Sequence, residues 1–234
     1  MKPSKLSISF QISIRITFML VLQWITYLIL IGSDHAFEQS GFYWATQLTV
    51  VNISLLIWMI YQFKKQGSNY LHLYKGVNKK NTFYFLKIFI PILIISMLPN
   101  ILLSLLFYQD PEIGTTFLIG DIPNMFMLFN LMIFPLFQGL VEIPFYFFYI
   151  LPKLKSLTYN KYIYIGLPVL FLSIQHAFMP FRFDLIYLIY RSLVFLPFAV
   201  FIGLLLDRKK EMLPYLVIIH ILMNTSLFVM YFIH

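Results

Sequence analysis

The sequence contains no cysteine and few charged residues. Of its 234 residues, 11% are charged and only nine are aspartate or glutamate. The absence of cysteine excludes a disulfide framework, a thiol nucleophile and thiolate ligands, and with the last a copper(I) or iron–sulfur site. A soluble domain has about 25% charged residues. The low charge content therefore indicates a membrane protein.

Apolar residues dominate the whole length of the chain. They make up 60% of it, with a mean hydropathy of +0.82. Since about 20 apolar residues cross a bilayer, seven runs are long enough to span it. They cover residues 10–32, 42–63, 82–108, 122–151, 162–179, 185–206 and 213–233. We predict an all-α fold, a polytopic bundle of about seven transmembrane helices around an intramembrane cavity. Three spans lie in an N-terminal part, 1–121, and four in a core, 122–234.

The charged loops predict the orientation of the bundle. Acidic residues without basic neighbours follow the first and third runs, at Asp34, Glu38, Asp110 and Glu112. Basic clusters lie at the other ends of the runs: Lys2, Lys5 and Arg15; Lys64, Lys65, Lys75, Lys79 and Lys80; Lys153, Lys155 and Lys161; Arg208, Lys209 and Lys210. This alternation predicts a multi-pass protein of a bacterial cell membrane, with a cytosolic N-terminus and an extracellular C-terminus. It also explains the net charge of +8 without nucleic-acid binding.

Four polar side chains inside the apolar runs are candidate site residues. His220 and Asn224 are one helical turn apart and share a face. Glu142 has no basic residue nearby, so it must be protonated, paired across helices or facing water. Counted from the cytosolic ends, these three and His176 all lie at a depth of about 15 to 22 Å. A shared site explains this common depth better than interhelical packing contacts do.

These residue types support hydrolytic chemistry. A glutamate can act as general base toward water, and a histidine beside it can hold that water or accept the proton. A second histidine and an asparagine can donate hydrogen bonds to a carbonyl oxygen that becomes anionic. Alternatively, Glu142, His176 and His220 form a ligand set for catalytic zinc with one open position. We expect Arg191 to form a structural ion pair with Asp184, seven residues earlier on the same face; contact of the two with substrate is the alternative.

Three segments carry a family resemblance: EIPFYFFYILPKL from Glu142, QHAFMP around His176 and HILMN from His220 to Asn224. They resemble the motifs of the CPBP family of intramembrane endopeptidases, which includes CAAX proteases and bacteriocin-immunity proteins. Those motifs are Glu-Glu-x-x-x-Arg, Phe-x-x-x-His and His-x-x-x-Asn or His-x-x-x-Asp. The resemblance covers about residues 138–226. It implies catalytic roles for Glu142, His176, His220 and Asn224, and makes 122–234 a CPBP-like catalytic core.

The first motif departs from the family pattern at two positions. Ile143 stands in place of the second glutamate and Phe147 in place of the arginine, so the supporting ion pair of the motif is missing; Leu172 replaces the phenylalanine of the second motif. The interpretation that best fits the sequence is a peptide hydrolase that opens to the cytosol. Its partners are the lipid bilayer and a membrane-associated peptide or protein substrate. The alternative is a weak or inactive relative that acts in bacteriocin self-immunity or as a membrane partner protein.

Overall fold

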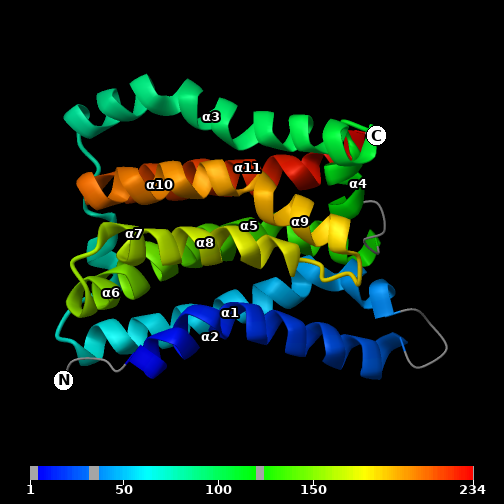
Figure 1. Cartoon of the computed structure of the whole chain (residues 1–234), viewed down its shortest axis with the longest axis horizontal. Helices are drawn as coiled ribbons and strands as arrows, with labels where there is room; N and C mark the ends of the chain where they lie inside the picture. The colour runs from blue at the N-terminus through cyan, green and yellow to red at the C-terminus, as the bar shows by residue number, and fades with distance from the viewer. Residues whose placement is uncertain (1–4, 32–36, 120–123, 234) are drawn as a thin grey trace.

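The computed structural model describes residues 5–31, 37–119 and 124–233, and it is helical throughout these ranges apart from short connections (Figure 1). Its first elements are α1 (Lys5–Thr26), η1 (Tyr27–Ile31), η2 (Phe37–Tyr43), α2 (Trp44–Lys65), η3 (Tyr70–Tyr74), α3 (Lys79–Tyr108) and α4 (Ile113–Ile119). The rest are α5 (Asn124–Pro144), η4 (Phe145–Ile150), α6 (Leu151–Leu157), α7 (Lys161–Tyr164), α8 (Gly166–Ile174), η5 (Gln175–Ala177), α9 (Leu185–Val194), α10 (Leu196–Arg208), η6 (Lys210–Met212) and α11 (Leu213–Ile233). Of the positions used above to predict topology, Lys2 and Asp34 lie outside the described residues.

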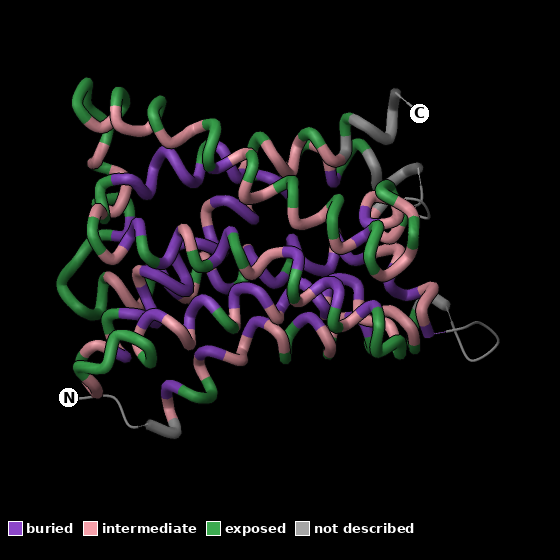
Figure 2. The backbone as a smooth tube through the Cα atoms, turned by 45° about the horizontal axis from the view of Figure 1, so that its top comes forward, coloured by how far each residue is buried: buried purple, intermediate pink, exposed green. Residues whose placement is uncertain are grey.

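The long helices lie side by side along one axis, and α1, α2 and α3 alternate in direction (Figure 1). Helix α5 lies at the centre, where it packs against α2 on one side and α11 on the other. Helix α8 packs against α10, and α3 covers α9 and α10. Only 11% of the apolar window of α3 is buried within the protein, against 61% for the stretch Leu128–Leu157. Figure 2 shows the same contrast between the outer α3 and the buried central helices.

Five stretches of the described residues are long and apolar enough to cross a membrane. They are Ser7–Ile29, Phe37–Lys65, Lys79–Tyr108, Leu128–Leu157 and Leu185–Arg208. The predicted all-helical membrane bundle is thus confirmed in outline, but the count of seven is not. The run 162–179 forms the short helices α7, α8 and η5, and the run 213–233 forms α11. Neither is among the five stretches.

The basic loops gather at one end of the bundle, on the left in Figure 1, where α2 ends, α3 begins and α10 passes into α11. Contacts between segments distant in sequence join them there. The backbone of Gly76 lies against that of Glu211, the Asn78 amide donates to the Tyr215 hydroxyl, and Lys155 forms an ion pair with Asp207. Helix α4 lies at the opposite end. The sequence pattern of alternating charge therefore corresponds to two ends in space.

Gly139 allows α5 and α11 to approach closely. A Cβ atom at this position would lie 2.4 Å from Cγ1 of Ile221, closer than side-chain carbons come in real proteins. Small residues let membrane helices pack with their backbones near one another. This close approach brings His220, one residue before Ile221 on α11, within reach of Glu142, three residues after Gly139 on α5.

Pro144 alters the same helix one turn further on. Proline has no N–H to donate to the carbonyl four residues earlier, here that of Leu140. The Tyr70 hydroxyl donates to this carbonyl instead, and Tyr74 lies beside it with its hydroxyl 2.9 Å from that of Tyr70. After Pro144 the chain continues as the π-helical turn η4. Turns of this kind are common at functional sites, and this one begins three residues after Glu142.

Asp184 does not form the ion pair predicted with Arg191. Its carboxylate accepts a hydrogen bond from the backbone N–H of Tyr187 at 3.1 Å and so caps the N-terminus of α9. An aspartate at this position satisfies a backbone donor that the helix leaves free. The capping preference of Asp184 prevails over the helical spacing on which the predicted pair was based.

Candidate active site

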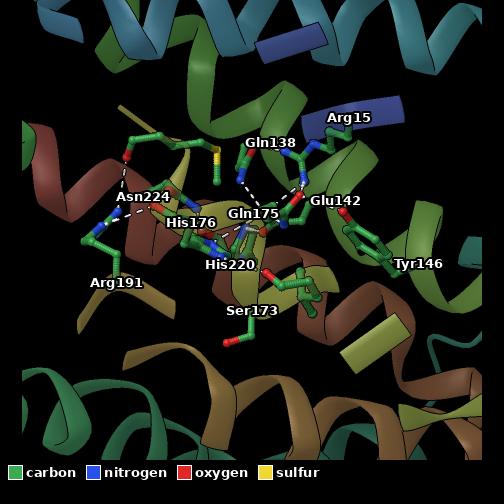
Figure 3. A network of polar contacts seen from close by, with 12 residues as sticks. Arg15, Gln138, Glu142, Tyr146, Ser173, Gln175, His176, Arg191, His220 and Asn224 are labelled. Carbon is green, nitrogen blue, oxygen red and sulfur yellow. Dashed lines mark hydrogen bonds and ion pairs between the residues drawn. The ribbon is translucent and has the colours of Figure 1, made fainter. Parts of the chain in front are cut away.

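Glu142 forms a buried ion pair with Arg15 at the centre of the bundle (Figure 3). Nη1 of Arg15, on α1, lies 2.9 Å from Oε1 of Glu142, on α5, and both side chains are at most 1% exposed. The sequence pattern assigns Arg15 to the cytosolic charges that orient the first span. That assignment is wrong, because the guanidinium is completely buried. The carboxylate is paired across helices, one of the three states expected for it.

Two glutamines bridge the two members of the ion pair. Gln138 accepts from Nη2 of Arg15 at 2.6 Å and donates to Oε1 of Glu142 at 2.8 Å. Gln175 accepts from Nη1 of Arg15 at 2.8 Å and donates to the same Oε1 at 2.6 Å. Each amide therefore presents its oxygen to the cation and its nitrogen to the anion. Hydrogen bonds to ionised groups are about twice as strong as neutral ones, so this network fixes the position of the carboxylate.

The network extends into the N-terminal half of the chain. Asn52 on α2 accepts from Nη2 of Arg15 at 3.1 Å and donates to Gln138 at 2.8 Å. Tyr146 completes the other side by donating to Gln175 at 2.9 Å. The resemblance covers only residues 138–226, but Arg15 and Asn52, from the N-terminal part of the chain, belong to the same buried polar network as Glu142.

His220 lies against the second oxygen of the carboxylate. Its Nε2 is 2.8 Å from Oε2 of Glu142, but the N–H is not directed along the line required for a hydrogen bond. Neither ring nitrogen has a hydrogen-bond partner among the described residues, although the residue is only 7% exposed. The ring lies nearly parallel to that of Phe198, with 6.5 Å between centroids. His220 is thus held by packing, with Nε2 against the carboxylate and Nδ1 without a hydrogen-bond partner among the described residues.

His176 faces the first oxygen of the carboxylate. Its Nδ1 lies 2.8 Å from the Leu172 carbonyl oxygen, which can only accept, so Nδ1 carries the hydrogen. In the neutral ring, Nε2 is then an acceptor, and it lies 3.6 Å from Oε1 of Glu142. The ring stacks on Phe195 with 3.6 Å between centroids. These contacts fix the tautomer and orientation of His176, as second contacts of catalytic histidines do.

Asn224 lies one helical turn beyond His220 on the cavity wall. Its Nδ2 donates to the His220 carbonyl at 2.8 Å, which leaves its second amide hydrogen free. It makes no direct contact with Glu142 in the described part of the chain. Glu142, His176, His220 and Asn224 nevertheless line one cavity of about 310 Å³. This volume is at the lower end of the range for small-ligand sites.

The cavity extends from Glu142 toward the α4 end of the bundle. Its wall includes Trp44 at the start of α2 and the segment from Gly114 to Leu118 on α4, and no residue of the basic loops. The described lining of the cavity therefore lies toward the α4 end of the bundle and not at the basic end. Two wall residues of α3, Met97 and Ile101, are 59% and 42% exposed, and Ser226 of α11 is also exposed. The cavity thus reaches the surface between α3 and α11.

The residues do not fit the zinc alternative. In the described ranges, no group of three His, Cys, Asp or Glu side chains is positioned to hold a metal ion. Oε1 of Glu142 already accepts hydrogen bonds from Arg15, Gln138 and Gln175. A guanidinium 2.9 Å from the carboxylate would also repel a divalent cation.

Ile143 and Phe147, which replace the polar residues of the first family motif, are both buried among apolar side chains. The ion pair missing from this motif is thus not restored by neighbours on α5. Arg15 supplies an arginine from a different helix. The sequence signal for it was an arginine inside the apolar run 10–32, where an ionisable residue is costly and usually functional.

We compared the chain with known proteins. No family model, curated protein or solved structure matches it. The functional assignment therefore depends on the geometry of the site and on the motif resemblance.

Proposed function

We propose that this protein is an intramembrane endopeptidase of the CPBP type. The observation that carries the proposal is the convergence of Glu142, His176, His220 and Asn224 on one cavity within a helical membrane bundle. A carboxylate, two imidazoles and an amide around one space are the groups that water-based peptide hydrolysis requires. The substrate is a membrane-associated peptide or protein.

The two oxygens of Glu142 have different roles in this proposal. Oε1 accepts three hydrogen bonds and is fully occupied. Oε2 has only the misaligned contact with His220, so it is the oxygen that can take a proton from a water molecule in the cavity. Nε2 of His176 is directed at the same carboxylate and can accept or return that proton. General acid–base catalysis of this kind accelerates reactions about 10²–10⁴-fold.

Asn224 and His220 stabilise the anionic oxygen that forms when water attacks the peptide carbonyl. Asn224, with its second amide hydrogen free, and His220, whose Nδ1 has no hydrogen-bond partner among the described residues, both lie on the cavity wall. Donors held in place before the reaction cost no reorganisation when the charge develops. The bundle supplies this rigidity through the close α5–α11 packing at Gly139.

A second function is favoured by the ion pair itself. A carboxylate held by one guanidinium and two amides is also what a purely structural glutamate looks like. An inactive member of the same type, acting in bacteriocin self-immunity or as a membrane partner protein, would retain this network for stability alone. In either case we propose a bacterial cell-membrane location, with seven passes, a cytosolic N-terminus and an extracellular C-terminus.

Incubation of the purified protein in lipid vesicles with membrane-embedded peptides separates the two functions. The endopeptidase proposal expects new peptide termini, identified by mass spectrometry, with wild type but not with Glu142→Gln. The same absence of cleavage with both proteins, across a broad set of apolar peptides, would favour the inactive alternative.

A further inference from the structure

Arg191 is a buried charge without a counter-ion. Apart from histidines, three ionisable residues of the described chain that are charged at neutral pH are buried. They are Arg15, Glu142 and Arg191. The first two neutralise each other. Arg191 is 3% exposed, and no described carboxylate lies within 4 Å of it, because Asp184 caps α9 instead. The interior around the cavity therefore carries one uncompensated positive charge, which is costly in a bilayer.

The present partners of Arg191 are all neutral: two backbone carbonyls, the Tyr187 hydroxyl and an aromatic ring. Nε and Nη2 each donate to a backbone carbonyl, of His176 and Met179, and both distances are 3.3 Å. These are longer than the usual 2.9–3.0 Å for such hydrogen bonds. The guanidinium also lies 5.2 Å from the ring centroid of Phe195. Carbonyl dipoles and a ring face attract a cation but do not neutralise it, so the charge remains available to an anion.

The cavity specifies what else that anion must carry. Arg191 lines the same cavity as Glu142, and the cavity reaches the surface between Met97 and Ile101 on α3 and Ser226 on α11. This part of α3 is apolar and faces outward, where the bilayer lies. A ligand that enters here must travel through lipid, so most of it must be apolar.

We propose that Arg191 is a binding subsite for a carboxylate carried on an apolar chain. The single uncompensated positive charge of Arg191 matches the single negative charge of a monoanion. A phosphate dianion would leave one negative charge without compensation. A guanidinium binds a carboxylate through two parallel N–H···O bonds, a geometry that an ammonium group does not offer. The carboxylate comes either from the C-terminus of an apolar peptide or from a fatty acid. This subsite does not require the proposed hydrolysis.

Equilibrium binding to the wild-type protein in nanodiscs of neutral lipid tests the proposal. The probes are oleic acid against oleamide, and a short peptide of leucine and alanine with a free C-terminal carboxylate against its C-terminal amide. Hydrogen bonds to ionised groups imply that the acid of at least one pair binds about 10- to 100-fold more tightly than its amide. The pair that shows the preference identifies the source of the carboxylate. Equal binding of acid and amide in both pairs would overturn the proposal.

Variants of Arg191 establish that this residue is responsible. Arg191→Gln should abolish the preference for the acid, whereas Arg191→Lys should retain part of it because the charge remains. Arg182→Gln is the matched control: Arg182 lies over the rings of Phe117 and Tyr187 and does not line the cavity, so the preference should be unchanged. A preference that persists in a folded Arg191→Gln protein would refute the assignment. If that variant does not fold, the lysine variant and the acid–amide comparison in wild type still decide it.

Discussion

Arg15 and Glu142 are 127 positions apart in the chain and form a buried ion pair at 2.9 Å. The pair connects the first helix to the central one, and Gln138 and Gln175 surround it with hydrogen bonds. A buried ion pair is strongly destabilising when one partner is lost, because the other charge is left without compensation. The N-terminal helix is therefore part of the buried polar core of the bundle.

Replacement of Arg15 by methionine should destabilise the protein more than the loss of both charges does. Arg15→Met leaves Glu142 unpaired and should lower the free energy of unfolding by about 3–5 kcal/mol. Adding Glu142→Gln removes the remaining charge and should recover most of that loss. Unfolding in detergent micelles, followed by circular dichroism, measures the wild type, Arg15→Met, Glu142→Gln and the double variant. If the two substitutions are simply additive, the ion pair is not the source of the effect.

The sequence predicted the helical membrane bundle because long apolar runs are a local property of the chain. It also indicated Glu142, His176, His220 and Asn224, because each is a polar residue inside such a run. It did not indicate that Arg15 pairs with Glu142, since that contact depends on how α1 packs against α5. Arg15 follows two lysines in the sequence, and its position there resembles that of a loop charge.

Tyr70 should stabilise the proline-containing turn of α5. Its hydroxyl donates to the Leu140 carbonyl, which Pro144 leaves without its helical partner. The Tyr74 hydroxyl also donates to this carbonyl at 3.4 Å, so Tyr70→Phe removes the shorter of two hydrogen bonds and should cost about 0.5–1.5 kcal/mol. In a Pro144→Ala background the alanine N–H can donate to Leu140, so the same substitution should cost clearly less. An equal cost in both backgrounds, measured by detergent unfolding, would mean that Tyr70 acts through packing alone.

The same tyrosines predict a loss of stability in alkali. Burial raises the pKa of Tyr70 well above its ordinary value of 10.0 and that of Tyr74 to about 12. A raised pKa in the folded state gives stability that is complete below the unfolded value, about pH 10. This stability is lost as the pH rises through the pKa of the tyrosine in the folded state. The free energy of unfolding of wild type should therefore fall above about pH 10, and that of Tyr70→Phe should fall less. The two curves, recorded in detergent, should converge; parallel curves would contradict this prediction.

The basic end of the bundle should face the cytosol. A tag after the last residue should then react with an impermeant reagent in intact cells, because α11 runs away from that end (Figure 1). A tag between Lys75 and Lys79, in the basic loop before α3, should react only after permeabilisation. The reverse labelling pattern would show that the basic end of the bundle faces outside the cell. The positive charge of these loops would then need another explanation.

The surroundings of Arg191 could not be predicted from the spacing of charged residues in the sequence. The spacing of Asp184 and Arg191 placed them on one helical face and predicted an ion pair. Asp184 instead begins the helix as its cap, since a side-chain oxygen next to free backbone N–H groups has a closer partner. Local capping geometry takes precedence over spacing here, and it leaves Arg191 free to act in the cavity.

Asn224 should contribute to catalysis without contributing much to stability. Asn224→Ala removes a donor to the anionic oxygen and should reduce kcat about 10²–10³-fold, with KM nearly unchanged. Asn130→Ala is the control, because Asn130 is a buried amide that binds Thr46 and does not line the cavity. Peptide cleavage in vesicles measures both. A similar reduction of kcat in the two variants would indicate a general effect on packing.

The most direct test of the proposed endopeptidase is the cleavage rate of a membrane peptide by Glu142→Gln. This variant keeps the shape of the side chain but removes the base, so the rate should fall by at least about 10²–10⁴-fold. Glu112→Gln makes the same chemical change at an exposed position and should cleave at the wild-type rate. A Glu142→Gln protein that is folded, is present at normal abundance and cleaves like wild type would contradict the account. The carboxylate would then be structural, and the protease proposal would have to be abandoned.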